Sequence, residues 1–433
     1  MASGFLPTQY QLMCVETLRK FNDEGWMLDD PQSPKPSLVR ALYKNSQLNV
    51  GDESLGLYKF ADWLPINRTL KGSAAPLTYK SEKLAAKLSL DNLYITISGY
   101  FPQVGANFQT CSFKETEAYS VCGRMDSNCE KVLVVASAGN TARAFAKVCS
   151  ENKIPLLLVV PHASVGALWF KEPIDERYVK LIVSQEGSDY FDAINLSNIV
   201  VEHSSKFYAE GGAKNVARRD GMGTTFLSAT TFIGEIPDYY FQAIGSGTGA
   251  IAAWEANMRL VEDGRFGNKI ARHILSQNAP FLVMYDAWKA SSRALLPFDD
   301  DTARKAASEI DAIVLSNRRP PYSLSGGVFD TLSATNGDVR SITNEKAKIA
   351  SELFEECEGV DIDNAAAVAV ASLIEAVESG EIEKDKIVMV NITGAGAKLM
   401  AKEHDLCGLK PCAVFANDAS VEEIISKVES LWE

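Results

Sequence analysis

Three apolar segments of the chain, residues 131–137, 238–244 and 386–392, each lead directly into a turn that contains glycine. Helical patterns alternate with these segments, for example over 141–151 and 364–378. Short β-rich segments that alternate with helices are typical of parallel strands joined by crossover helices, so the sequence predicts the α/β class. Ligands of open α/β sheets bind beyond the carboxyl ends of the strands. The three turns therefore predict one shared ligand site.

Charge and composition limit the class of partner. The chain of 433 residues has 43 Lys and Arg against 56 Asp and Glu, a formal net charge of −13. This balance argues against a nucleic acid or an anionic membrane as the main partner, because both favour clustered positive charge. No run approaches the ~20 apolar residues of a membrane helix. The N-terminus lacks the regions of a secretory signal, and eight scattered cysteines indicate a reducing compartment, so we expect a cytoplasmic protein.

The pattern along the chain predicts three regions. Residues 1–75 are mixed and rich in turn residues, and we expect an extension that wraps a larger body, with Trp63 in a contact between copies of a homo-oligomer. Residues 76–118 and 236–433 are expected to form the larger domain, which holds two of the three glycine turns. Residues 119–235 are expected to form a smaller α/β domain with the remaining turn.

The turn richest in glycine precedes a helical pattern over 250–262 and consists of Gly245, Ser246, Gly247, Thr248 and Gly249. Successive backbone N–H groups and hydroxyls at a helix start stabilise a phosphate dianion. The segment also fits a relaxed dinucleotide-binding pattern, which requires an acidic residue at the end of a second strand about 20 residues later. Glu262 and Asp263 close the helix instead. Phosphate binding is therefore favoured over a dinucleotide and over a purely structural turn.

Two other segments carry candidate reactive or binding groups. Lys114, in Ser-Phe-Lys, stands close to a helix start, where desolvation and the positive helix end disfavour its charged form and suit it to Schiff-base chemistry. Taken alone, a solvated surface lysine is the commoner outcome. Ser137, Asn140 and Thr141 lie at a strand end and helix start, and Thr393 begins a similar turn; taken alone, these are typical helix-capping residues.

Taken together and in this order, the Ser-Phe-Lys, Ser-x-Gly-Asn, glycine-rich and Thr-Gly-x-Gly segments resemble the fold-type II pyridoxal-phosphate enzymes, and within them the threonine synthase family, over roughly residues 56–400. The resemblance implies that Lys114 carries pyridoxal 5′-phosphate covalently, that Asn140 contacts the pyridine hydroxyl and that Thr393 meets the ring nitrogen. It also implies that residues 245–249 hold the cofactor phosphate. The implied fold has two lobes, each with a mainly parallel twisted sheet flanked by helices.

Departures from the threonine synthase pattern bear on the substrate. That family usually has Ser-Phe-Lys-Asp-Arg, whereas residues 112–116 are Ser-Phe-Lys-Glu-Thr, and its terminal His-Gly-Leu-Lys is Ala-Gly-Ala-Lys at 395–398. Residues 210–222 and 317–327 resemble the cysteate synthase group, which makes L-cysteate and phosphate from O-phospho-L-serine and sulfite. The resemblance implies β-replacement on these small-molecule substrates. Threonine synthase itself, another β-replacement enzyme or ammonia lyase, and a cofactor-binding protein without turnover remain open.

Two anionic substrates require a local positive charge in a chain of net charge −13. The candidates are Arg143, Arg218 and Arg318, together with the neighbouring Lys214, Arg219 and Arg319. Arginine is favoured because a guanidinium suits bidentate binding of oxyanions. With Ser137 and Thr141, the first three form the expected substrate site. The four histidines are widely separated and one cysteine stands alone in the N-terminal region, so no metal site is inferred.

Overall fold

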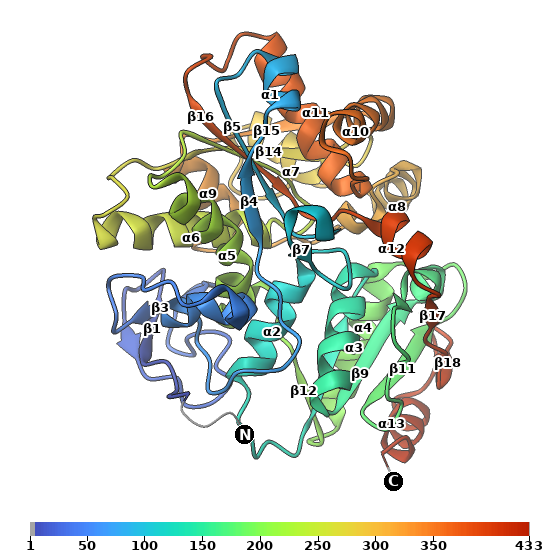
Figure 1. Ribbon diagram of the computed structural model, residues 1–433. Coiled ribbons are helices and arrows are strands. Elements are labelled where there is room, and N and C mark those ends of the chain that lie inside the picture. Colours follow the sequence, from blue (N-terminus) through green and yellow to red (C-terminus); the bar gives the residue numbers. More distant parts are fainter. Residues whose placement is uncertain (1–4, 433) are drawn as a thin grey trace.

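The computed structural model describes residues 5–432 and contains two mainly parallel sheets, one above the other in Figure 1. All strand pairs of the larger sheet are parallel except the antiparallel pair of β4 and β5 at its edge. This arrangement confirms the predicted α/β class. The order of the larger sheet is β15 (Asp338–Ile342), β14 (Arg272–Asn278), β13 (Tyr239–Ala243), β16 (Ile387–Ile392), β5 (Asn92–Ile97) and β4 (Leu77–Lys80).

The smaller sheet is parallel throughout and includes a strand from the end of the chain. Its order is β12 (Phe207–Ala209), β8 (Val132–Ala136), β9 (Leu156–Pro161), β11 (Val179–Ser184) and β18 (Ala413–Phe415). The expected boundary put all of residues 236–433 in the larger domain, whereas β18 pairs with β11 in the smaller sheet. The reason is hydrophobic, because Phe415 is buried in the core on one face of that sheet.

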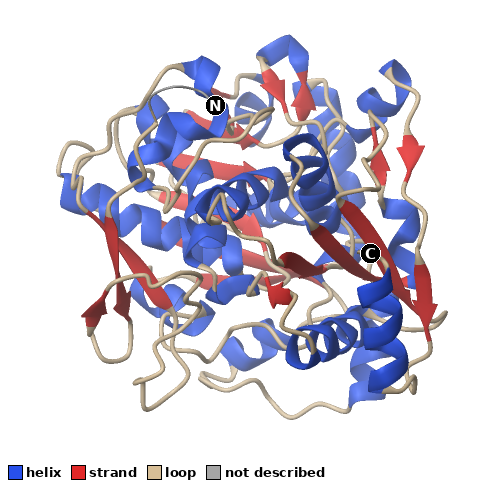
Figure 2. Ribbon diagram, turned by 90° about the horizontal axis from the view of Figure 1, so that it is seen from below, coloured by secondary structure: helices blue, strands red, loops and turns tan. Residues whose placement is uncertain are grey.

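Helices cover both faces of each sheet (Figures 1 and 2), so the strands are buried on both sides and read as continuous apolar runs. On the larger sheet, α10 (Asn344–Glu358) and α11 (Asn364–Glu378) pack on one face, and α5 (Val216–Ile233) and α6 (Thr248–Asp263) on the other. On the smaller sheet, α3 (Asn140–Asn152) covers one face, and α4 (Tyr190–His203) and α13 (Val421–Ser430) cover the other.

One helix joins the two lobes. Helix α2 (Lys114–Arg124) packs against both α5 and α3, and every residue from Glu115 to Arg124 is buried. Gly221 allows the close crossing, because a Cβ there would lie 2.3 Å from the carbonyl oxygen of Thr116 on α2. The start of α2 is therefore held firmly between the lobes, at the centre of Figure 1.

The first 75 residues form more structure than the expected wrapped extension. Strands β2 (Lys20–Phe21), β1 (Tyr10–Cys14) and β3 (Val39–Tyr43) make an antiparallel sheet, followed by the 3₁₀ segment η1 (Glu53–Trp63). Trp63 is only 1% exposed and donates its indole N–H to the carbonyl of Asn45 at 2.9 Å. It is thus a core residue of one chain and not the contact between copies that the sequence suggested.

The remaining elements are short. The helices are α1 (Lys83–Leu88), α7 (Val283–Lys289), α8 (Asp300–Glu309), α9 (Val328–Ala334) and α12 (Ala397–Glu403). Two small pairs of strands consist of β6 (Tyr100–Phe101) with β7 (Ala106–Asn107) and β10 (Trp169–Phe170) with β17 (Cys407–Gly408).

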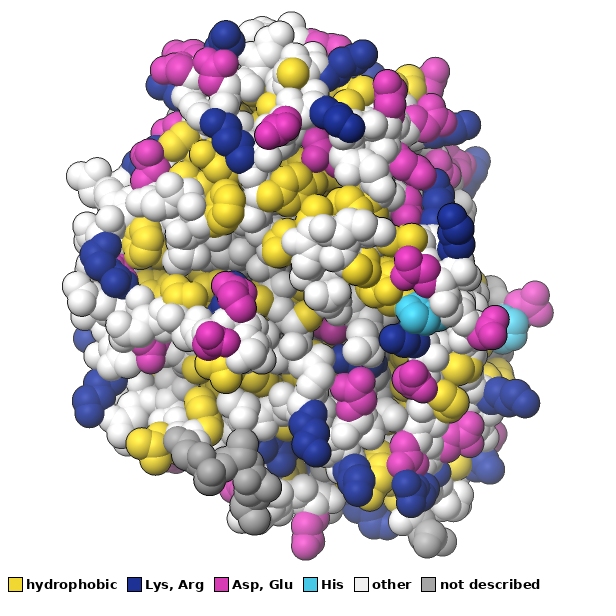
Figure 3. Space-filling view, in the orientation of Figure 1, with side chains coloured by type: hydrophobic (Ala, Val, Ile, Leu, Met, Phe, Trp, Pro, Cys, Tyr) yellow, Lys and Arg dark blue, Asp and Glu magenta, His cyan; other side chains and the backbone are white. Residues whose placement is uncertain are grey.

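The surface carries charges of both signs. On the face shown in Figure 3, acidic and basic side chains are interspersed over the outer parts, and hydrophobic side chains gather across the middle. Among residues 5–432, the helices include none that combines the length and apolar character needed to cross a bilayer. Over the same residues, His, Cys, Asp and Glu side chains form no cluster of three that could hold a metal ion.

Candidate active site

A pocket between the two lobes brings together the residues that the sequence assigned to a cofactor. It is formed where β8, β13 and β16 end in their glycine turns, which is the edge at which α/β sheets bind ligands. The lining includes Lys114, Asn140, Gly245, Ser246, Gly247, Thr248, Gly249 and Thr393. Further lining residues, which were not assigned from the sequence, are Phe113, Met222, Gln242, Ala243, Ile244, Val314, Leu315, Asp363 and Ala365.

The glycine turn after β13 allows only glycine at its tightest points. Gly247 has φ +76°, and a Cβ there would lie 2.3 Å from Cγ2 of Val328. A Cβ on Gly245 would lie 2.8 Å from a backbone oxygen, and one on Gly249 would meet the amide of Gln242. Helix α6 begins at Thr248, and the first N–H groups of a helix lack intrahelical acceptors, which suits this helix start to an anion. The N–H of Thr248 donates to Oγ of Ser246 at 3.3 Å.

The turn after β16 fixes the reactive lysine segment by backbone hydrogen bonds. Phe113 donates its N–H to the carbonyl of Thr393 at 2.9 Å, and Ala395 donates to the carbonyl of Cys111 at 3.1 Å. Asp363 caps the start of α11 by accepting from the N–H of Ala366 at 2.7 Å. Lys114 and Thr393, which are far apart in sequence, are therefore held in a fixed relation across the pocket.

Lys114 is the first residue of α2, and its ammonium group contacts two neighbours. Its Nζ lies 3.4 Å from Oε2 of Glu117 and 4.7 Å from the centre of the Phe113 ring. Burial lowers the pKa of Lys114, and the Glu117 carboxylate opposes that shift. A lysine whose neutral form is favoured is a nucleophile towards an aldehyde.

Asn140 begins α3 and has its amide orientation fixed by Arg143. Its Oδ1 accepts from Nη2 of Arg143 at 2.9 Å, so the NH₂ group of Asn140 remains free to donate into the pocket. The other guanidinium donors of Arg143 bond the carbonyls of Thr110 and Ala167, and its plane stacks over Trp169 at 4.1 Å. Arg143 thus supports Asn140, and its donors are already engaged by the protein.

The other predicted substrate residues lie at different distances from the pocket, and none of them lines it. Ser137 and Thr141 flank Asn140, with Ser137 Oγ accepting the N–H groups of Gly139 and Ala142 at 3.0 Å. Arg318 lies apart from these groups, with its guanidinium paired to Asp189 at 2.8 Å and Asp300 at 3.0 Å.

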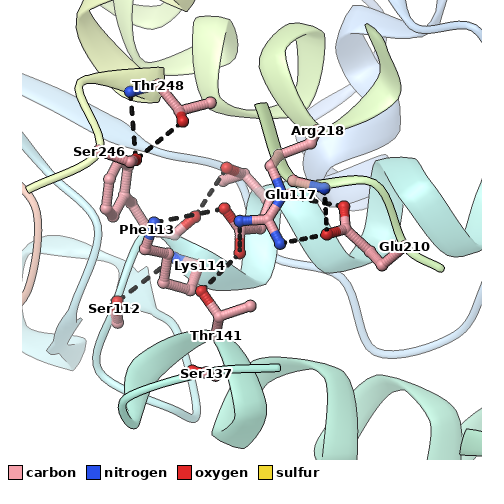
Figure 4. A network of polar contacts seen from close by, with 12 residues as sticks. Ser112, Phe113, Lys114, Glu117, Ser137, Thr141, Glu210, Arg218, Ser246 and Thr248 are labelled. Atoms are coloured by element: carbon pink, nitrogen blue, oxygen red, sulfur yellow. Dashed lines mark hydrogen bonds and ion pairs between the residues drawn. The ribbon is translucent and has the colours of Figure 1, made fainter. Parts of the chain in front are cut away.

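Arg218 belongs to a buried ionic cluster beside Lys114 (Figure 4). It contacts Glu117 Oε1 at 3.1 Å and Glu210 at 2.8 Å, and Thr141 donates to the same Glu117 oxygen at 2.8 Å. Neither carboxylate was among the site residues predicted from the sequence. The spacing of three between Lys114 and Glu117 could have indicated a shared helix face, whereas nothing local in the sequence places Glu210 there.

The residues present fit pyridoxal 5′-phosphate. A crowded cradle of backbone N–H groups at a helix start suits a phosphate, and an amine of lowered pKa suits an aldehyde. The Asn140 amide and the Thr393 hydroxyl supply polar groups for a substituted pyridine between them. The donor set therefore matches a phosphorylated aromatic aldehyde at both ends.

Comparison with known sequences defines the class. The family model described as pyridoxal-phosphate dependent enzyme matches residues 103–394, well over half of the chain. A curated cysteate synthase of Methanosarcina mazei is 44% identical over 419 residues, covering 96% of this chain and 99% of the relative. One from Methanocella paludicola is 46% identical over 378 residues, covering 87% of each. The chain belongs to the pyridoxal-phosphate dependent enzymes and, within them, to the group that contains the curated cysteate synthases.

Solved structures confirm the fold-type II architecture. Maize serine racemase superposes with a TM-score of 0.57 at 15% identity, covering 76% of this chain and 92% of that one. The processed form of threonine deaminase isoform 2 from Solanum lycopersicum gives 0.55 at 16% identity, covering 86% and 97%. The protein is thus a pyridoxal-phosphate dependent enzyme of the predicted fold, with the predicted cofactor.

Proposed function

We propose that this enzyme makes L-cysteate from O-phospho-L-serine and sulfite and releases inorganic phosphate. The observation that carries the proposal is the 44% identity to a curated cysteate synthase over 96% of the chain. In this reaction the bond between Cβ and the phosphate oxygen breaks, and the sulfite sulfur forms the new bond to Cβ.

The residues of the pocket divide the work. The bound cofactor supplies an electron sink for negative charge developing at Cα of the substrate. We assign Lys114 to covalent attachment and, once its amine is free, to removal and return of the Cα proton. We assign the Asn140 amide to the pyridine hydroxyl, Thr393 to the ring nitrogen and residues 245–249 to the cofactor phosphate. The support is that all of them line one pocket.

The substrate-binding residues remain predictions. Ser137 and Thr141 lie where the first N–H groups of α3 favour an anion. Arg143 and Arg218 are close to the pocket, but their donors already bond carbonyls or carboxylates, so an anion would have to displace those partners. Arg318 would have to leave two carboxylates as well. A role for the arginines therefore requires a rearrangement on substrate binding.

The deciding experiment measures phosphate release from O-phospho-L-serine with and without sulfite, using enzyme loaded with pyridoxal 5′-phosphate. We expect release that depends on sulfite and equals the L-cysteate formed. Consumption of phosphohomoserine would instead indicate a threonine synthase, and keto acid with ammonia a lyase. A visible cofactor band that no amino acid perturbs would indicate a binding protein without turnover.

Two further predictions concern assembly and location. We propose that the chain forms a homo-oligomer, which sedimentation velocity would test directly. Because Trp63 is buried, the Trp63→Phe variant should keep the oligomeric state. We propose a cytoplasmic location, supported by eight cysteines that are all free. Fractionation of the native host would test it.

A further inference from the structure

The carboxylate of Glu117 is the nearest charged group to the amine of Lys114. The two residues lie one helical turn apart on α2, so their side chains share a face. Oε2 of Glu117 is 3.4 Å from Nζ of Lys114, and the Glu117 side chain has no exposed surface, compared with 19% for Lys114. A carboxylate that is fully removed from water requires compensating partners.

Those partners hold the other oxygen of Glu117 and leave Oε2 for Lys114. Oε1 accepts from the Thr141 hydroxyl at 2.8 Å and from Arg218 Nη1 at 3.1 Å. Arg218 is held in turn by Glu210, with Nε to Oε1 at 2.8 Å. Figure 4 shows Glu117 between Lys114 on one side and Arg218 on the other. The carboxylate is therefore fixed from three elements, α2, α3 and α5.

The charge count of the cluster depends on the proton of Lys114. Glu117 and Glu210 contribute two negative charges and Arg218 one positive charge, so the cluster is neutral only when Lys114 is an ammonium ion. The other titratable groups near this cluster are Tyr190, at the start of α4, and Asp363, at the start of α11. Burial raises the pKa of both groups. Tyr190 is therefore uncharged, whereas Asp363, with a pKa of about 6, keeps most of its negative charge at neutral pH and faces Arg143 as well as Lys114.

We propose that Glu117 is the positioning partner of Lys114. Its carboxylate stabilises the ammonium form of the free lysine and orients the ammonium group for return of the proton to Cα. This inference rests on the proposed role of Lys114. In the forward step the Cα proton moves to the unshared electron pair of Nζ, and the C–H electron pair stays with the substrate. Glu117 remains a carboxylate and accepts a hydrogen bond from the new ammonium group. In the reverse step the proton leaves Nζ and the ion pair is lost.

The first test uses the apoenzyme, so it does not depend on turnover. The rate at which acetic anhydride modifies Lys114 is measured against pH, with mass spectrometry of the Lys114 peptide. Removal of the carboxylate in Glu117→Gln should lower the apparent pKa of Lys114 by at least about one unit, because the group that most opposes the effect of burial is then lost. Glu117→Asp should recover part of the shift. Glu210→Gln is the matched control, because it leaves the contact between Glu117 and Lys114 in place. It should lower the apparent pKa of Lys114 by less than half as much as Glu117→Gln does.

The second test uses the holoenzyme and follows exchange of the Cα proton of O-phospho-L-serine with solvent deuterium. In Glu117→Gln the exchange rate should fall about tenfold or more while the KM for the amino acid stays within twofold. An apparent Lys114 pKa in Glu117→Gln within 0.3 of the wild type would overturn the proposal. If Glu117→Gln does not fold, Glu117→Met, which also removes the carboxylate, is measured in its place, and an apparent Lys114 pKa within 0.3 of the wild type has the same force. Failure of wild-type Lys114 to carry the cofactor would contradict the proposed function instead, and the apoenzyme result would stand.

Discussion

The two sides of the pocket present different kinds of polar group to a ligand. At the end of β13, the turn 245–249 offers backbone N–H groups, packed so closely that a Cβ on Gly247 would overlap Val328. At the start of α2, Lys114 faces side chains that carry full charges, with Glu117 held by Arg218. Backbone dipoles do not titrate, whereas a buried ion pair changes whenever one partner gains or loses a proton. The first side suits an anion of constant charge, and the second suits a group whose charge changes during the reaction.

The largest expected effect lies on the charged side. Lys114→Ala removes both the covalent attachment and the proposed proton carrier, and we expect kcat to fall at least about 10³-fold. Borohydride reduction followed by peptide mass spectrometry should find the cofactor on Lys114 in the wild type and on no lysine in the variant. Lys410→Ala, at an exposed position, is the control. Wild-type labelling at another lysine would refute the assignment.

Acid should lower the stability of the larger lobe, which contains the turn 245–249. Burial of His273 on β14 lowers its pKa to about 4, below its ordinary value of 6.5. As the pH falls, the unfolded chain therefore binds this proton first, and stability is lost between about pH 6.5 and pH 4, by about 3 kcal/mol in total. Urea unfolding of the wild type and of His273→Asn should be measured across this pH range. The difference between their free energies of unfolding should become smaller as the pH falls. The comparison of the two proteins is needed because Asp363, whose pKa is raised to about 6, acts in the opposite direction.

The tightness of the glycine turn can be separated from its backbone conformation. Gly247 and Gly264 bracket α6 and have φ of +76° and +79°, but a Cβ would overlap Val328 only at Gly247. Alanine at either position costs about 1 kcal/mol of backbone strain. Gly247→Ala should also weaken cofactor binding, by roughly 10- to 100-fold, because the added Cβ displaces the backbone N–H groups that bind the anion. Titration of the apoenzymes by absorbance would show it, and equal cofactor affinities in the two variants would contradict the cradle.

The smallest effect concerns Arg143, which touches the pocket only through Asn140. Arg143→Met should lower cofactor affinity about tenfold, the loss expected for one hydrogen bond that orients the amide. Arg318→Met, an equally buried arginine away from Asn140, should leave it unchanged. If Arg143→Met raises only the KM for O-phospho-L-serine, Arg143 binds the substrate as the sequence suggested. If Arg218→Ala and Arg318→Ala both leave this KM unchanged, these two arginines do not bind the anions.

Local sequence patterns predicted the side of the pocket that the turn 245–249 forms. A buried strand, a glycine turn and a helix start are contiguous in the chain, so residues 238–262 predict β13, the turn and α6 to within two residues. The helix over 364–378 has the predicted bounds because Asp363 caps it and Gly380 follows it. The family resemblance then placed Lys114, Asn140 and Thr393 in one pocket.

Contacts between distant segments were not predictable in the same way. Arginines near glycine turns suggested anion sites, but a sequence does not show that Glu210 and Glu117 already neutralise Arg218. The N-terminal region looked like a surface wrap, because its strands are short and their partners are separated by a long loop. Strand β18 gave too weak a pattern in three residues to reveal its place in the smaller sheet.

The position of β18 has a consequence for how the chain is made. Residues 413–415 close one edge of the smaller sheet by pairing with β11, although the rest of that sheet comes from residues 132–209. During synthesis on the ribosome, this edge of β11 therefore presents unpaired N–H and C=O groups until residues 413–415 emerge. Exposed strand edges of this kind pair readily with other chains. A copy cut before residue 413 should accordingly expose this edge of β11 and aggregate more readily than the full chain.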